Sequence, residues 1–132
     1  MVRRMVRLVA AVIVAGGAAG GCAVSADGRG VRAAAAEFFA AVQHGDGERA
    51  CATLVPEAAR SLESGGSSCA EEIGKLGLDG GDIANVQVWG DSAQVAVGTD
   101  MVFLTRWGSG WKVSAAGCRP RTGRPYECEV EA

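Results

Sequence analysis

The sequence predicts an α+β domain in which N-terminal helices pack on one face of a curved antiparallel β-meander. Two observations predict this class. Apolar residues recur at helical spacing before Gly80-Gly81, and after that point they alternate with polar residues at the period of strands. Helices that precede the strands, rather than alternate with them, are typical of α+β domains. A chain of 132 residues has room for one such core.

The first 21 residues have the three parts of a secretory signal peptide. Three arginines stand in the first seven residues, an apolar stretch covers 8–15, and small residues fill 16–21. The apolar stretch is about half of the roughly 20 residues that cross a membrane, so a signal peptide is favoured over a spanning helix. The paired arginines at 3–4 leave twin-arginine export open beside the general route.

Cys22 is the predicted lipid acceptor. The run AGGC at 19–22 resembles the bacterial lipobox, in which small residues precede a cysteine that receives diacylglycerol; Ala19 replaces the usual leucine. The thiol is required because the lipid is attached through a thioether. We therefore expect residues 1–21 to be removed and the lipid on Cys22 to hold the protein on the extracytoplasmic face of the cell membrane.

The mature chain is predicted to consist of a flexible tether over 22–30, rich in small and polar residues, and one domain over 31–132. The whole sequence has 13 basic and 15 acidic residues, and loss of the leader removes three of the basic ones. An acidic mature chain is an unlikely partner for nucleic acid, so we expect none.

Four short helices are expected. The first is an amphipathic helix that begins at Val31 and ends near His44; its apolar positions are Val31, Ala35, Phe38, Phe39 and Val42. Asp46 is placed to cap the second helix, and Pro56 suits the first turn of the third. Ser68 and Glu71 have the spacing of a capping box, which predicts a fourth helix that ends around Gly77.

Five strands are expected after these helices. Alternating apolar residues mark the first three, with glycine and aspartate in the turns between them: Val86 and Val88, Val95 and Val97, Val102 and Leu104. A fourth strand covers 111–115. A fifth, continuous strand places Tyr126, Cys128 and Val130 on one face and the acidic residues of 127–131 on the other.

The four remaining cysteines predict two disulfides. Cys51 and Cys69 lie in the helical half, whereas Cys118 and Cys128 flank one turn in the strand half, so local pairing is expected among the three possible pairings. A metal site is the rival interpretation, but neither pair has the C-x-x-C spacing and the sequence has one histidine, His44. No metal or other cofactor is therefore expected.

Five short phrases support a family resemblance: AEFFA at 36–40, RACATL at 49–54, WKV at 111–113, AGCRP at 116–120 and PYEC at 125–128. They resemble small actinobacterial (Streptomyces-like) lipoproteins with an NTF2-like domain. The resemblance implies a cone formed by a curved sheet wrapped against helices. That shape is used by enzymes, ligand carriers and interaction modules, so it does not by itself choose a function.

The resemblance also implies where an active site would lie, because NTF2-like enzymes place an Asp, His or Tyr inside the cone. The candidates here are His44, Asp82, Asp100 and Tyr126. His44 is next to a glycine in an expected turn, and Asp100, like Asp91, falls between strands, where its side chain suits a turn. We therefore assign no catalytic residue.

Two further groups are candidates for binding. Trp89, Trp107 and Trp111 supply the bulk that could line an apolar pocket, but packing at the core or sheet edge is favoured because the domain has few aromatic residues. Four arginines would meet anionic lipid headgroups or wall polymers if they gathered at one end of the sheet, but a solvated hairpin turn is favoured for them: Arg106, Arg119, Arg121 and Arg124.

Together these patterns predict a non-enzymatic lipoprotein of the cell envelope whose domain binds a partner protein or a small ligand outside the cytoplasmic membrane. The alternative is a small NTF2-like enzyme, an isomerase or hydrolase, with its active site in the cone. A buried carboxylate or histidine facing a cavity would favour the enzyme, and an open apolar cavity would favour ligand binding.

Overall fold

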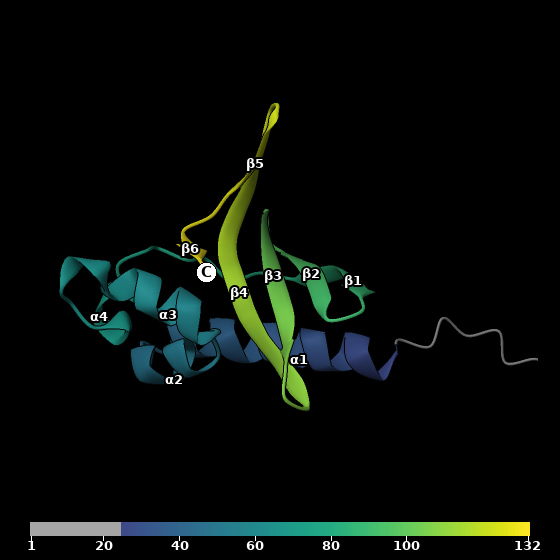
Figure 1. Cartoon of the computed structure of the whole chain (residues 1–132), viewed down its shortest axis with the longest axis horizontal. Coiled ribbons are helices and arrows are strands. Elements are labelled where there is room, and N and C mark those ends of the chain that lie inside the picture. Colours follow the sequence, from purple (N-terminus) through teal and green to yellow (C-terminus); the bar gives the residue numbers. More distant parts are fainter. Residues whose placement is uncertain (1–24) are drawn as a thin grey trace, which may run out of the picture.

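The computed structural model describes residues 25–132 and confirms the α+β class (Figure 1). The expected signal peptide and Cys22 lie outside the described residues. The helical part comes first and consists of α1 (Ala26–Gln43), α2 (Gly47–Ala52), α3 (Pro56–Leu62), the short 3₁₀ turn η1 (Glu63–Gly65) and α4 (Cys69–Ile73). The strands follow as β1 (Ile83–Trp89), β2 (Ser92–Val97), β3 (Asp100–Trp107), β4 (Gly110–Arg121), β5 (Arg124–Glu127) and β6 (Val130–Glu131).

Helix α1 begins at Ala26, five residues before the expected start, so the tether predicted over 22–30 is wrong for 26–30. The hydroxyl of Ser25 accepts a hydrogen bond from the Gly28 amide at 3.0 Å and caps the helix. Two glycines in this first part lower its helix propensity, but both are packed. Gly28 is buried, and a Cβ on Gly30 would lie 3.1 Å from the Trp111 ring. Tertiary packing therefore overrides local propensity here.

The expected caps of the three short helices are confirmed. Asp46 accepts a hydrogen bond from the Arg49 amide at 3.1 Å and starts α2, and Pro56 occupies the first turn of α3. Ser68 and Glu71 form the capping box of α4, with both side chains 3.2 Å from the backbone amides that they accept from. Helix α4 ends at Ile73, earlier than the expected Gly77.

The strands form one antiparallel sheet in the order β1-β2-β3-β4-β5, with β6 also paired to β4. Alternate residues of each strand face the helices. On β2 and β3 the buried set is Ala93, Val95, Val97, Val102 and Leu104. Helix α1 crosses this face, as Figure 1 shows, and packs on β1, β2 and β4. The other face of β2 and β3 is not covered by α1, and we call it the open face.

The core fills the space between the helices and the sheet. Its largest fully buried side chains come from both layers: Phe38, Leu54, Ile73, Leu104, Val113 and Val130. Within residues 25–132 no polar or charged residue is buried. In the same range, no helix is long and apolar enough to span a membrane.

The fifth strand is not continuous, which corrects the sequence-based expectation. It is divided into β5 and β6, and Cys128 and Glu129 lie between them. The end of β5 and both residues of β6 pair with β4 in one register, because Arg119 faces Glu127 and Ala116 faces Val130; the register shifts by one residue toward the pair of Arg121 and Arg124. The interruption lies opposite Gly117, whose φ of 65° bends β4 out of regular strand geometry. Strand β4 is also longer than the expected 111–115, because it pairs with β3 along its first part and with β5 and β6 along its second.

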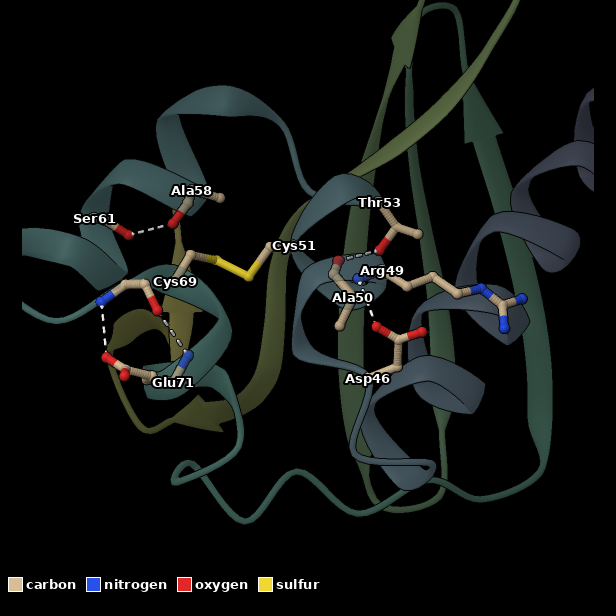
Figure 2. The surroundings of a disulfide bond; sticks show 10 residues. Asp46, Arg49, Ala50, Cys51, Thr53, Ala58, Ser61, Cys69 and Glu71 are labelled. Carbon is tan, nitrogen blue, oxygen red and sulfur yellow. Dashed lines mark hydrogen bonds between the residues drawn. A yellow bond between two sulfur atoms is a disulfide. The ribbon is translucent and has the colours of Figure 1, made fainter.

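The structure contains both expected disulfides. Cys51 on α2 is bonded to Cys69 on α4, as Figure 2 shows, and the bond joins two helices that are adjacent in space and 18 residues apart in sequence. Cys118 and Cys128 are bonded across the β4–β5 hairpin, with their Cα atoms 3.9 Å apart. All four sulfurs are therefore in covalent bonds and are not thiolate ligands for a metal.

Candidate functional site

Two adjoining hollows form a groove on the open face of the sheet. Their volumes are about 420 and 350 Å³, and they share Phe103, Ser114 and Ala132. The first extends toward Thr105 and Trp107, and the second toward Pro125 and Tyr126. We call the combined feature, from Trp107 to Tyr126, the open-face groove.

Strand alternation places the floor of the groove. Val102 and Leu104 are buried under the helices, so Phe103, which lies between them, and Thr105, which follows Leu104, face the other way. Tyr126 of β5 packs against Phe103 edge to face, with ring centroids 5.2 Å apart. The groove therefore has an aromatic pair at its centre, contributed by two strands that are not neighbours in the sheet.

The wall of the groove is formed where the helices and the C-terminus reach β4. The Ala132 amide donates a hydrogen bond to the Ser114 carbonyl at 3.0 Å, which places Ala132 beside β4. Ser61 of α3 donates a hydrogen bond from its hydroxyl to the Glu131 carbonyl at 2.8 Å. Glu57 and Glu131 line the groove as exposed residues, so acidic groups stand at an otherwise mostly apolar site.

The three tryptophans do not meet in one pocket. Trp107 lines the open-face groove. Trp111 lines a separate hollow of about 250 Å³ with Glu37 and Arg49, and Trp89 is 57% exposed at the end of β1. The three tryptophans therefore do not line one pocket, and Trp107 is the one of the three that contributes to the groove.

The expected acid and base candidates are dispersed. His44 and Asp82 are exposed, at the end of α1 and just before β1. Asp100 forms an ion pair with Arg119 at 3.5 Å. Tyr126 is the one member of this group that borders the groove.

The four arginines do not gather either. Arg119 and Arg121 lie on the far half of β4, paired with Asp100 and Glu127, while Arg106 lies near the β3–β4 turn. The side chain of Arg124 lies outside the described part of the structure. Arg106 and the hairpin arginines therefore do not form a single basic patch, and Arg119 and Arg121 are exposed.

Arg106 instead connects three segments. Its guanidinium lies 3.1 Å from the Asp27 carboxylate of α1 and 3.0 Å from that of Asp91 in the β1–β2 turn. It also stacks 4.5 Å above the Trp111 ring. The hydrogen bond to Asp27 is the main reason that the pKa of Arg106 is raised. Arg106 therefore holds the start of α1 against one end of the sheet.

Sequence reasoning missed Phe103 and Ser114 as groove residues. A signal for Phe103 is present, because it is a large aromatic residue at a position of β3 where alternation puts a side chain away from the core. No comparable signal exists for Ser114 or Ala132, since their proximity depends on how β6 folds back along β4.

No protein-family model, no curated protein and no solved structure matches this chain.

Proposed function

We propose that this chain is a cell-envelope lipoprotein, held on the extracytoplasmic face of the cell membrane by a lipid on Cys22, whose open-face groove binds an apolar or aromatic group. The observation that supports binding most is the pair formed by Phe103 and Tyr126, which lies in a hollowed, mostly apolar part of the open face. This apolar or aromatic group belongs to a small ligand or to a partner protein, because either can present such a group to the groove.

Binding is proposed rather than catalysis because of where the space lies. In an NTF2-like cone the reactive side chains would project between the sheet and the helices, and here Phe38, Leu104 and Val113 fill that region. The groove is on the other face. A further hollow of about 420 Å³ does lie between α1 and the sheet, but no titratable side chain lines it; its lining is Ala36, Phe39, Ala40, Gln43, Gly80, Gly81, Ile83 and Val97. The lining of the groove offers aromatic surface, with exposed carboxylates nearby.

The NTF2-like interpretation remains part of the proposal. It rests on the phrases noted in the sequence and on the order of four helices followed by a meander. The lipid anchor rests on the sequence around Cys22. The two disulfides are compatible with it, because exported compartments permit their oxidation.

Binding of the neutral apolar dye Nile red to the protein tests the groove. The dye is expected to increase in fluorescence with the native protein and to lose at least tenfold in affinity with Phe103→Gln. The control is Met101→Gln, which changes a half-buried residue of the same face of β3 that does not line the groove. Equal loss in both variants, or in neither, would overturn the groove assignment.

A photo-crosslinking residue at Phe103 separates the two sources of the bound group. In envelopes of the native host, a crosslink that adds the mass of a protein indicates a partner, and one that adds a few hundred daltons indicates a small ligand. The same residue placed at Met101 is the control. Crosslinks of equal yield at both positions would contradict a specific site.

A further inference from the structure

The start of α1 is fixed to one end of the sheet. Asp27 in its first turn is paired with Arg106 of β3, and Arg106 is also paired with Asp91 in the β1–β2 turn. Gly30 packs against Trp111 just after the β3–β4 turn. We call this end, with the two turns and the first turn of α1, the N-terminal end of the domain. Figure 1 shows the β4–β5 hairpin projecting on the opposite side from the β3–β4 turn.

The distance from this end to the proposed anchor is short. Three residues connect Cys22 to the helix cap Ser25, counting the cap itself. An extended chain covers at most about 3.6 Å per residue, so the Cα atoms of Cys22 and Ser25 are within about 11 Å. If the lipid on Cys22 is in the membrane, the N-terminal end is the part of the domain that can reach the membrane surface. This step rests on the proposed function.

Two large aromatic side chains are exposed at the same end. Trp89 is the last residue of β1 and is 57% exposed, and Trp107 is the last residue of β3 and is 44% exposed. They share the open face by register: Trp89 pairs with Ser92, Ser92 pairs with Thr105, and Trp107 follows Thr105 by two residues.

The charges at this end suit a membrane surface. The amino group of Lys112 lies 5.8 Å from the centre of the Trp107 ring. The nearby carboxylates of Asp27 and Asp91 are both paired with Arg106, which reduces their repulsion of lipid phosphates. Tryptophan is enriched where hydrocarbon meets headgroups because its ring is apolar and its N–H needs a polar partner.

We infer that the N-terminal end of the domain docks on the membrane that holds the lipid, with Trp89 and Trp107 seated in the headgroup layer and Lys112 beside lipid phosphate. This orientation turns the β4–β5 hairpin away from the bilayer. The groove then runs from the membrane surface at Trp107 outward to Tyr126.

Tryptophan quenching by brominated lipid tests this docking. The lipoprotein purified from membranes is reconstituted in vesicles of phosphatidylglycerol and phosphatidylcholine whose acyl chains are brominated near the headgroup, and its fluorescence is compared with that in unbrominated vesicles. We expect strong quenching of the native protein and a loss of at least threefold in the quenched fraction for Trp89→Phe/Trp107→Phe. Circular dichroism verifies that the variant folds.

Two controls define the outcome. Trp111→Phe removes the tryptophan packed under Arg106 and should leave the quenched fraction unchanged or higher. Tyr126→Trp, made in the double variant, puts a reporter at the far end of the groove and should add fluorescence that brominated lipid does not quench.

Flotation of the vesicles distinguishes failure of the lipid anchor from failure of the docking. Protein that does not float with vesicles has no lipid anchor, which overturns the proposed function and this inference with it. Protein that floats but shows no quenching, or shows quenching equally at Tyr126→Trp, keeps the anchor and overturns the docking. The docking is supported if quenching is lost in Trp89→Phe/Trp107→Phe and retained in Trp111→Phe.

Discussion

At the scale of single residues, Gly117 shows how backbone conformation and packing act on one position. Its φ is 65°, in the left-handed region that side chains with a Cβ disfavour. A Cβ there would lie 2.8 Å from Leu78 and 3.0 Å from Glu129. The residue thus permits both the bend in β4 and the close approach of the segment before β6.

Gly117→Ala is expected to destabilise the domain more than Gly123→Ala does. Gly123 has a similar φ of 68°, and a Cβ added to it would have nothing within 4 Å. Its substitution should therefore lower the free energy of unfolding by about 1 kcal/mol, which is the cost of a positive φ in a residue with a Cβ. Gly117→Ala has the same cost and, in addition, the steric overlap of the new Cβ with Leu78 and Glu129, which typically lowers the free energy of unfolding by about 1–3 kcal/mol more. Urea unfolding of both variants measures the difference. Equal midpoints would show that the bend adapts without strain.

Arg106→Gln is expected to loosen the start of α1. The substitution removes the charge that pairs with Asp27 and Asp91 and the stacking on Trp111. Hydrogen exchange at the amides of 29–32 should accelerate, while exchange in α3 should not. Lys112→Gln, a cation on the neighbouring strand, is the matched control. Unchanged exchange at 29–32 would mean that packing alone holds the helix end.

The pair formed by Glu72 and Lys75 predicts a pH dependence. A hydrogen bond from Lys75, together with its charge, holds the pKa of Glu72 below its ordinary 4.5, and the same hydrogen bond raises the pKa of Lys75. A lowered acid pKa gives stability that is present above 4.5 and is lost as pH falls through the lowered value. Carboxyl NMR should show the Glu72 pKa rising in Lys75→Gln and staying unchanged in Arg60→Gln, which alters a different pair.

At the scale of elements, short helices depend on their connections. Helices α2 and α4 have six and five residues, too few to be stable alone. The Cys51–Cys69 bond, drawn in Figure 2, joins the two helices, and we expect this bond and the contacts between the helices to supply the missing stabilisation. Strand β6 is shorter still, but Val130 is fully buried and holds it against β4.

Removing either disulfide is expected to cost about 3 kcal/mol, because closing loops of this length has similar entropy in both cases. The local effects should differ. Cys51→Ala/Cys69→Ala should accelerate hydrogen exchange in α2 and α4, and Cys118→Ala/Cys128→Ala should do so in β5. Each double variant is the control for the other. Identical exchange patterns in both would contradict local stapling of separate elements.

Features set by local patterns were predictable from the sequence. The buried stripe of α1, the caps at Asp46 and Ser68, and the alternation of β2 and β3 all depend on residues close in the chain. Features that depend on distant partners were not. The early start of α1 needs Trp111 beside Gly30, and the break between β5 and β6 needs the bend at Gly117. The groove needs β6 beside β4, so the sequence signalled only its aromatic residues: Trp107 and Tyr126, which were candidates for other sites, and Phe103.

At the scale of the whole molecule, the two faces of the sheet have different roles. One is covered by helices and forms the core, and the other has the groove with Phe103 and Tyr126. The first turn of α1 connects the domain to the proposed anchor at one end of this sheet. We therefore propose one orientation of the molecule, with the N-terminal end of the domain at the membrane and the groove extending away from it.

Intact mass of the protein taken from membranes of its native host tests the central claim, which is a lipid-anchored domain closed by two disulfides. We predict loss of residues 1–21, a diacylglyceryl adduct that disappears in Cys22→Ser, and a gain of four hydrogens on reduction of the two disulfide bonds. A retained leader, an unmodified Cys22 or a mass that reduction does not change would contradict it.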